Sequence, residues 1–175
     1  MGVLHGEQYL EIRRPLPPAA TVITTPCIVS IQDKGRAAVL VIGAETRVEG
    51  RDGRKEVAAY QEITVFARGA GGFGVLQGGG RDRPAGATAP ADPPTGEMPS
   101  ARASASVPPA AALLYRLTGD ANPLHADSEF AALAGFSRPI LHGLATLAYA
   151  VRAVMAEYAD GKAEGVRTIK VRTNE

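Results

Sequence analysis

The chain has 175 residues, 45% of them hydrophobic and 21% charged, which is the composition of a protein that folds around a globular core. Its formal net charge of +1 gives no general attraction to nucleic acid or to an anionic membrane surface. The single cysteine, Cys27, excludes an intramolecular disulfide and fits a reducing compartment. No signal peptide opens the sequence, and the longest apolar run, residues 144–155, is shorter than the about 20 residues that span a bilayer. We therefore expect neither secretion nor membrane insertion.

Residues 4–68 carry a β pattern. Runs rich in Val, Ile and Thr occupy residues 22–23, 27–31, 37–44 and 62–67, with turn sequences at Asp33-Lys34-Gly35 and Asp52-Gly53. Strands joined by tight turns pair antiparallel with their neighbours, so this pattern predicts a meander. The glycine-rich sequence GAGGFG at 69–74 lacks the Lys-Ser/Thr pair of a P-loop, and we interpret it as the exit of the last strand.

Residues 78–106 differ in composition from the rest of the chain. Ala, Pro, Gly, Ser and Thr dominate, and there are few large apolar side chains whose burial could offset the entropy of ordering the backbone. We predict a flexible linker over 78–106 that joins a first domain at 1–77 to a second domain at 107–175.

The second domain reads as helices around one polar loop. Pro108-Pro109 favours a helix over 110–117, which Gly119 would end, and Asp127 or Ser128 can cap a short helix that ends near residue 133. Apolar side chains at helical spacing predict a longer helix over Gly143–Tyr158. Alternating residues 166–171 predict a final strand.

The polar loop between the first two of these helices reads GDANPLH and holds a carboxylate, a carboxamide and an imidazole. Histidine is the side chain most easily poised for proton transfer near neutral pH, and a nearby carboxylate can orient it or share a water with it. Asp120 and His125 are therefore candidates for an acid/base pair. The alternative is structural: Asp120 caps a helix, Asn122 forms a turn before Pro123, and His125 has no chemical role.

A second polar feature, His142-Gly143, stands directly before the long helix. The first backbone N–H groups of a helix lack internal partners and lie at its positive end, and glycine lets a ligand approach them closely. Such N–H groups can stabilise the negative oxygen of a thioester enolate. The alternative for His142 is packing or capping of the helix.

The forty residues 115–154, YRLTGDANPLHADSEFAALAGFSRPILHGLATLAYAVRAV, resemble the hydratase-2 signature of MaoC-like proteins, (R)-specific enoyl-CoA hydratases. They are especially similar to the hydratase domain of the type 2 peroxisomal multifunctional enzymes. LHGEQYLE at 4–11, DKGRA at 33–37 and RGAGGFG at 68–74 resemble the N-terminal half of the same proteins, in the same order.

This resemblance implies an α+β hot-dog fold, an antiparallel sheet wrapped around a long helix, as part of a double hot dog. Residues 1–77 would be the C-terminal part of the first repeat, and 107–175 the N-terminal part of the catalytic repeat. Asp120 and His125 would be catalytic, Asn122 would support their loop, and Gly143 would donate the oxyanion N–H. The residues expected to bind the substrate are His5, Gly6, Lys34 and His142.

The implied reaction is the hydration of (2E)-enoyl-CoA to (3R)-3-hydroxyacyl-CoA, a lyase step of fatty-acid metabolism and β-oxidation. It needs no metal and no cofactor, because CoA is part of the substrate. The chain resembles the middle of a family member and lacks segments at both ends, so we expect association, as a homodimer. The compartment would be the cytoplasm of a bacterium or the peroxisome of a eukaryote. Two alternatives stay open: a non-catalytic acyl-CoA-binding or assembly subunit, and a hot-dog thioesterase.

Overall fold

The computed structural model describes residues 3–74, 82–90, 92 and 95–172. Contacts between residues divide the chain into two units, one of residues 1–95 with 164–175 and the other of residues 96–163. The first unit contains a five-stranded sheet, and the second contains the helices that flank the polar loop. No helix in the described part of the chain is long and apolar enough to cross a membrane.

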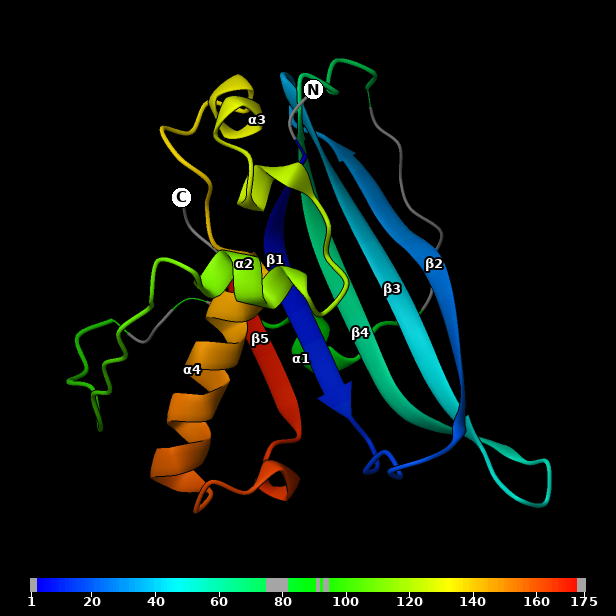
Figure 1. The fold of residues 1–175 in the computed structure, drawn as a ribbon. Coiled ribbons are helices and arrows are strands. Elements are labelled where there is room, and N and C mark those ends of the chain that lie inside the picture. Colours follow the sequence, from blue (N-terminus) through cyan, green and yellow to red (C-terminus); the bar gives the residue numbers. More distant parts are fainter. Residues whose placement is uncertain (1–2, 75–81, 91, 93–94, 173–175) are drawn as a thin grey trace. The chain divides into compact units, whose positions relative to one another are not determined.

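The sheet of the first unit is antiparallel throughout, with the strand order β2-β3-β4-β1-β5 (Figure 1). The predicted runs 27–31, 37–44 and 62–67 lie within β2, β3 and β4, and these three strands form the predicted meander. Gly35 and Gly53 adopt positive φ of 74° and 75° in the two predicted turns. The strand bounds are Val3–Ile12 for β1, Thr21–Asp33 for β2, Ala37–Glu49 for β3, Lys55–Arg68 for β4 and Thr168–Arg172 for β5.

Strand β2 is one long strand, although the sequence indicates two short runs, at 22–23 and 27–31. Pro26 interrupts the pattern, because proline has no N–H to donate to a neighbouring strand. In the described sheet β2 is an edge strand whose one neighbour is β3, and an edge strand tolerates a proline whose missing N–H would face solvent.

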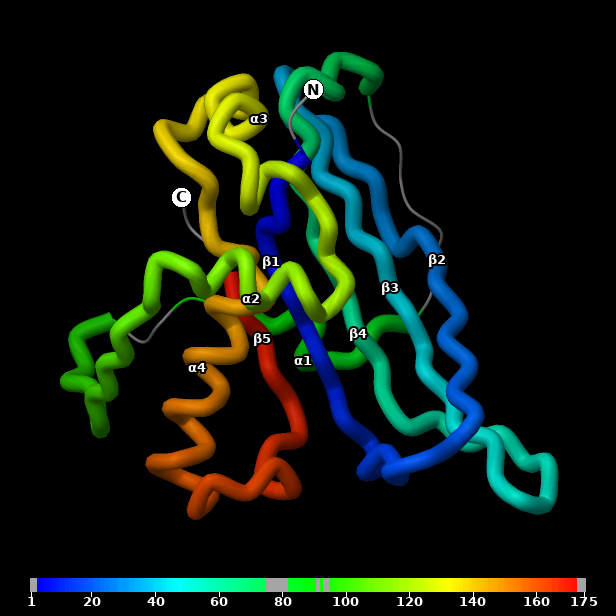
Figure 2. The backbone as a smooth tube through the Cα atoms, viewed as in Figure 1, coloured from blue at the N-terminus to red at the C-terminus, as the bar shows by residue number. Residues whose placement is uncertain are grey.

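Strand β1 lies between β4 and β5, so the sheet joins residues from opposite ends of the chain (Figure 2). It pairs with β4 from Val3↔Ala67 to Ile12↔Ala59, with a register irregularity between His5 and Glu7. Its other edge pairs with β5, from Glu7↔Arg172 to Glu11↔Thr168. The predicted strand at 166–171 is therefore a strand, but its contacts place it in the first unit, whereas the predicted boundaries assign it to the second domain.

The second unit contains the predicted helices at nearly the predicted bounds. Helix α3 begins where the Asp127 carboxylate accepts hydrogen bonds from the N–H groups of Glu129 and Phe130, at 2.8 and 3.1 Å. Gly119 and Gly135 follow α2 and α3 with positive φ of 121° and 91°, a conformation that favours glycine. The elements are α2 at Ala111–Arg116, the 3₁₀ turn η1 at Pro123–His125, α3 at Ser128–Leu133 and α4 at Gly143–Tyr158, which the 3₁₀ turn η2 at Ala163–Gly165 follows.

Residues 82–90 have fixed partners in the first unit, although composition predicts a flexible linker there. They contain a short helix, α1 (Ala85–Thr88). Arg83 donates from Nε, at 2.9 Å, to the carboxylate of Glu62 in β4, whose side chain is 3% exposed. Lys170 of β5 donates to the carbonyl oxygens of Ala87 and Ala89, at 2.8 and 2.5 Å. Charged and backbone hydrogen bonds hold this segment where apolar burial is scarce. Of the rest of the predicted linker, residues 78–81, 91 and 93–94 lie outside the described residues, and the described residues 92 and 95–106 contain no helix or strand.

The Glu62–Arg83 pair predicts an acid-sensitive step in the stability of the first unit. Burial raises the pKa of Glu62, but hydrogen bonds from Arg83 and Tyr60 outweigh it and hold the pKa below its usual 4.5. A carboxyl whose pKa is depressed in the folded state contributes stability above its unfolded pKa and loses it as the pH falls through the folded pKa. We expect the urea midpoint to fall as the pH drops below about 4.5, and Glu62→Gln to flatten this dependence.

A suitable control is Glu56→Gln, because Glu56 forms an ion pair with Arg14 but its side chain is 64% exposed. Exposed pairs contribute about 0–1 kcal/mol, so this variant should keep the acid-dependent loss of the wild-type chain. Equal pH dependence in the wild-type chain and in Glu62→Gln would show that another carboxylate governs the acid transition.

Candidate active site

The loop that leads from α2 into η1 is held by its own side chains. Asp120 Oδ1 accepts a hydrogen bond from the Asn122 N–H at 3.1 Å, and Asn122 Oδ1 accepts one from the Leu124 N–H, also at 3.1 Å. Pro123 is the first residue of η1 and suits that position, because its φ is fixed and the missing N–H has no partner to lose there. Asn122 therefore forms the turn before Pro123 and caps η1, whereas Asp120 accepts a hydrogen bond within the loop and caps none of the described helices, and its second carboxylate oxygen is not used in the turn.

His125 is the last residue of η1, and it is 8% exposed. Its Nδ1 lies 2.8 Å from the carbonyl oxygen of Ile140. Because a carbonyl only accepts hydrogen bonds, Nδ1 carries the ring proton and Nε2 keeps a lone pair in the neutral imidazole. The backbone of Ile140 thus sets the tautomer that a general base needs, with Nε2 able to accept a proton.

His142 stacks on His125, with ring centroids 3.7 Å apart and planes inclined by 23°. The ring of Tyr115, in α2, also contacts the His142 ring, with the two ring centroids 4.7 Å apart. His142 is 2% exposed, and its Nε2 lies 3.8 Å from Asp120 Oδ2. Burial lowers the pKa of His142 below its usual 6.5, and His125 lowers it further, while Asp120 opposes both. His142 is therefore neutral at pH 7.

The structure brings Asp120, His125 and His142 together although 22 positions separate the first from the last. One side-chain nitrogen or oxygen of each lies within 4.8 Å of those of the other two. Gly143, the predicted oxyanion donor, is the first residue of the 16-residue helix α4 and directly follows His142. The first N–H groups of a helix have no intrahelical partner, so the Gly143 N–H is a candidate donor to an oxyanion.

An apolar cavity of about 360 Å³ lies between α2 and α4 in the same unit. Tyr115, whose ring contacts His142, also lines this cavity together with Ala145 and Tyr149. Tyr115 thus connects the wall of this cavity to the polar cluster, and apolar groups of a ligand could lie there.

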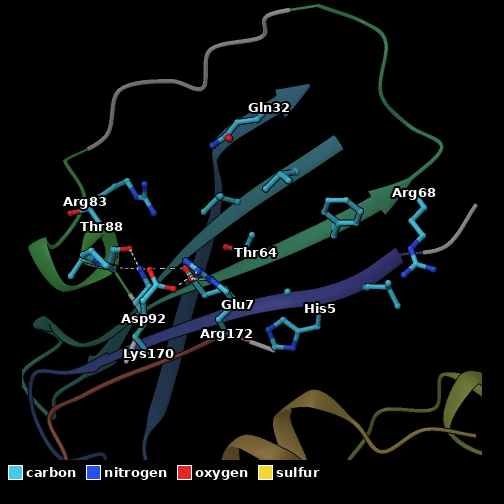
Figure 3. Close-up of a pocket in the computed structure, with 18 residues that line it drawn as sticks. His5, Glu7, Gln32, Thr64, Arg68, Arg83, Thr88, Asp92, Lys170 and Arg172 are labelled. Atoms are coloured by element: carbon cyan, nitrogen blue, oxygen red, sulfur yellow. Dashed lines mark hydrogen bonds and ion pairs between the residues drawn. The ribbon is translucent and has the colours of Figure 1, made fainter. Parts of the chain in front are cut away.

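The remaining predicted residues belong to the first unit. His5 and Gly6 lie in β1 at its register irregularity and line a cavity of about 970 Å³ (Figure 3). Lys34 is exposed in the turn between β2 and β3, where its N–H donates to the Ala37 carbonyl at 2.8 Å. Their roles in binding substrate stay predictions.

Sequence reasoning missed the charged group on the wall of this first-unit cavity. Glu7 of β1 lies 3.4 Å from both Lys170 Nζ and Arg172 Nε of β5, and Arg172 also contacts Asp92 at 3.0 Å (Figure 3). Lys170 and Arg172 are two residues apart and so point to one face of the strand. The alternation of side chains along β5 was visible in the sequence, but the pairing of β5 with β1 was not.

Both parts of the chain match models of known domains. Residues 90–173 match the model of the MaoC-like domain, and residues 1–69 match that of the N-terminal domain of MFE-2 hydratase 2. The chain thus contains a MaoC-like domain and an MFE-2 hydratase 2 N-terminal domain. It is 43% identical to the peroxisomal enoyl-CoA hydratase 2 of Arabidopsis thaliana over 97% of this chain and 54% of that protein. It therefore spans about half the length of this relative and 27% of the Drosophila melanogaster peroxisomal multifunctional enzyme type 2.

Solved structures agree with this assignment. The full-length peroxisomal multifunctional enzyme type 2 of Drosophila melanogaster matches 98% of this chain and 29% of its own, with a TM-score of 0.80 and 38% identity. A MaoC-like dehydratase from Phytophthora capsici matches 99% of this chain and 57% of its own, with a TM-score of 0.77 and 34% identity. These likenesses confirm the prediction of an α+β chain of the hot-dog class.

Proposed function

We propose that this chain carries the hydration site of an (R)-specific enoyl-CoA hydratase, which adds water reversibly to (2E)-enoyl-CoA and gives (3R)-3-hydroxyacyl-CoA in fatty-acid metabolism. The observation that carries the proposal is the cluster of Asp120, His125 and His142 beside the first N–H groups of α4. The match to the MaoC-like domain and the relatives named enoyl-CoA hydratase 2 support the same reaction.

The reaction needs a base that activates water, an acid that protonates C2 and a hydrogen-bond donor that stabilises the negative charge on the thioester oxygen. His125 Nε2 takes a proton from a water that it shares with Asp120, and the oxygen of that water bonds to C3. The electron pair of the C2=C3 bond moves onto the thioester oxygen, which accepts a hydrogen bond from the Gly143 N–H. A proton from the His125–Asp120 pair then reaches C2 and restores the carbonyl. General acid/base help is worth about 10²–10⁴-fold and one oxyanion donor about 10²–10³-fold.

We propose a role in substrate binding or loop support for each of the remaining candidate residues. His5, Gly6 and Lys34 would hold the CoA thioester, with Asn122 holding the catalytic loop and His142 packed against the reacting group. CoA is part of the substrate, and the step transfers no electrons, so the reaction needs no separate cofactor. We place it in the cytoplasm of a bacterial source or the peroxisome of a eukaryotic one, the compartment that relatives' names give.

We also propose a homodimer. Leu144, Val154 and Tyr158 of α4 are 40%, 55% and 62% exposed, and a row of large apolar side chains at the surface favours association. The competing function is an acyl-CoA-binding or assembly subunit without turnover.

The deciding experiment follows crotonyl-CoA with the purified chain. Loss of the ultraviolet absorbance of the enoyl thioester reports hydration, and a thiol reagent in a parallel sample reports thioester cleavage. Coupling the product to a dehydrogenase specific for (3R)-3-hydroxyacyl-CoA, and in a second sample to one specific for the (3S) isomer, gives the stereochemistry.

Hydration with (3R) product supports the proposal. Thiol release would establish a thioesterase instead, and saturable binding of crotonyl-CoA with neither signal would establish the binding subunit. A (3S) product would contradict the proposed stereochemistry even if hydration occurs.

A further inference from the structure

The cluster of Asp120, His125 and His142 offers two imidazoles and one carboxylate, a donor set that zinc accepts. One nitrogen or oxygen of each residue lies within 4.8 Å of the other two. In a tetrahedral zinc site with bonds of about 2.0–2.1 Å, the ligand atoms lie about 3.3 Å apart. His142 Nε2 and Asp120 Oδ2, at 3.8 Å, are already close to that separation.

His142 points to a ligand independently of this spacing. Its side chain is 2% exposed, and neither Nδ1 nor Nε2 has a hydrogen-bond partner among the described residues. Buried polar atoms are nearly always paired, so two unpaired nitrogens on one buried ring call for a specific explanation. A bound ion would satisfy one of them directly.

His125 is prepared for the same ligand by its backbone contact. Its Nδ1–H donates to the Ile140 carbonyl at 2.8 Å, which leaves the lone pair on Nε2. Histidines that bind metals commonly donate their other N–H to a carbonyl or carboxylate, which fixes the ring and raises its basicity. Ile140 thus provides the outer contact that a metal-binding histidine uses.

The stacked rings must open before both can bind one ion. Their planes are inclined by 23°, and an ion in the plane of one ring would lie outside the plane of the other. The Ile140 contact holds His125, so a shared ion would require His142 to turn, and His142 has no hydrogen bonds to lose among the described residues.

We propose that Asp120, His125 and His142 bind one zinc-class divalent cation, with water as the fourth ligand, and that the bound ion blocks the hydration site. Imidazole favours zinc, copper and nickel over magnesium and calcium, so the latter should not compete. The ion would occupy His125 Nε2, the atom that the proposed function uses as base. The inhibition rests on the proposed function, whereas the binding does not.

The test uses the chain after treatment with a chelator and measures Zn²⁺ binding by competition with a chromophoric chelator, with Co²⁺ spectra as a second readout of coordination. We expect one ion per chain, and His142→Gln and Asp120→Asn should each weaken binding by more than about tenfold, the lower limit for removing even an outer contact. The chain has three histidines and one cysteine, so His5→Gln and Cys27→Ser are matched controls that should bind as the wild type does.

Imidazole nuclear magnetic resonance of the wild-type chain makes the result independent of any variant. Addition of Zn²⁺ should shift the ring signals of two of the three histidines and leave those of His5 in place. Failure to bind, a shift of His5, or unchanged affinity in folded Asp120→Asn would each overturn the proposal. None of these measurements uses turnover, so they succeed or fail separately from the hydratase assay.

Discussion

Replacing Asp120 with Asn is expected to lower kcat for enoyl-CoA hydration by about 10²–10⁴-fold, the range for one lost acid/base group. The Asn side chain keeps an oxygen to accept the hydrogen bond from the Asn122 N–H, so the loop should survive. The side chain of Asp120 is 48% exposed, and the melting temperature should change little. Steady-state kinetics with crotonyl-CoA and thermal unfolding together check both expectations.

Asp127→Asn is the matched control for this change. Asp127 lies in the same segment, but its carboxylate caps α3 by accepting from the N–H groups of Glu129 and Phe130. Asn is also a good capping residue, so activity and stability should both stay close to wild type. Equal losses of activity in the two variants would mean that activity depends on the structure of this segment and not on the Asp120 carboxylate.

His125→Gln tests the other member of the pair. Glutamine keeps a donor for the Ile140 carbonyl but cannot take a proton from water at neutral pH. We expect a loss similar to that of Asp120→Asn. Groups that act on one water as a unit are strongly non-additive, so the double variant should lose little more than either single one. Fully multiplicative losses would show that the two residues act in separate steps.

The extent to which this site is predictable from sequence depends on how local each interaction is. Asp120, Asn122 and His125 lie within six residues, and the loop that joins them is built from their own turns. Helix α4 has the predicted bounds because its apolar spacing is a local signal. The stacking of His142 on His125 spans 17 positions and depends on the chain's path through α3, which no spacing rule encodes.

In the sheet, too, the local features were predictable from the sequence and the long-range contacts were not. The turns at Gly35 and Gly53 are set by short sequences, and with them the β2-β3-β4 meander is predictable. The pairing of β1 with β5 and the docking of Arg83 on Glu62 join residues far apart in the chain. A charged side chain in a Pro- and Gly-rich segment looks solvated in the sequence, and its buried partner shows only in three dimensions.

The loop after β4 packs directly on the turn between β2 and β3, so that the backbone of Gly71 lies against the backbone of Gly35 and Ala37. Asp33 fastens the two segments together, because its carboxylate accepts hydrogen bonds from the N–H groups of Gly35, Gly72 and Gly74, at 2.7, 3.0 and 2.7 Å. The glycine-rich sequence at 69–74 thus binds a carboxylate of the chain itself. This packing also holds the turn that contains Lys34.

Gly71→Ala is expected to destabilise the first unit by about 3 kcal/mol or more, the upper end for overpacking. A Cβ on Gly71 would lie 2.6 Å from both the nitrogen and the oxygen of Ala37 and would also overlap the Gly35 carbonyl, and backbone atoms cannot swing aside as a side chain can. Gly50→Ala is the control, because its Cβ comes within 3.0 Å only of the Asp52 carboxylate, which can rotate away. Urea unfolding of both variants measures the difference. Similar midpoints for the two would mean that the loop at 69–74 does not press on the β2–β3 turn, and Lys34 would then be held by the turn alone.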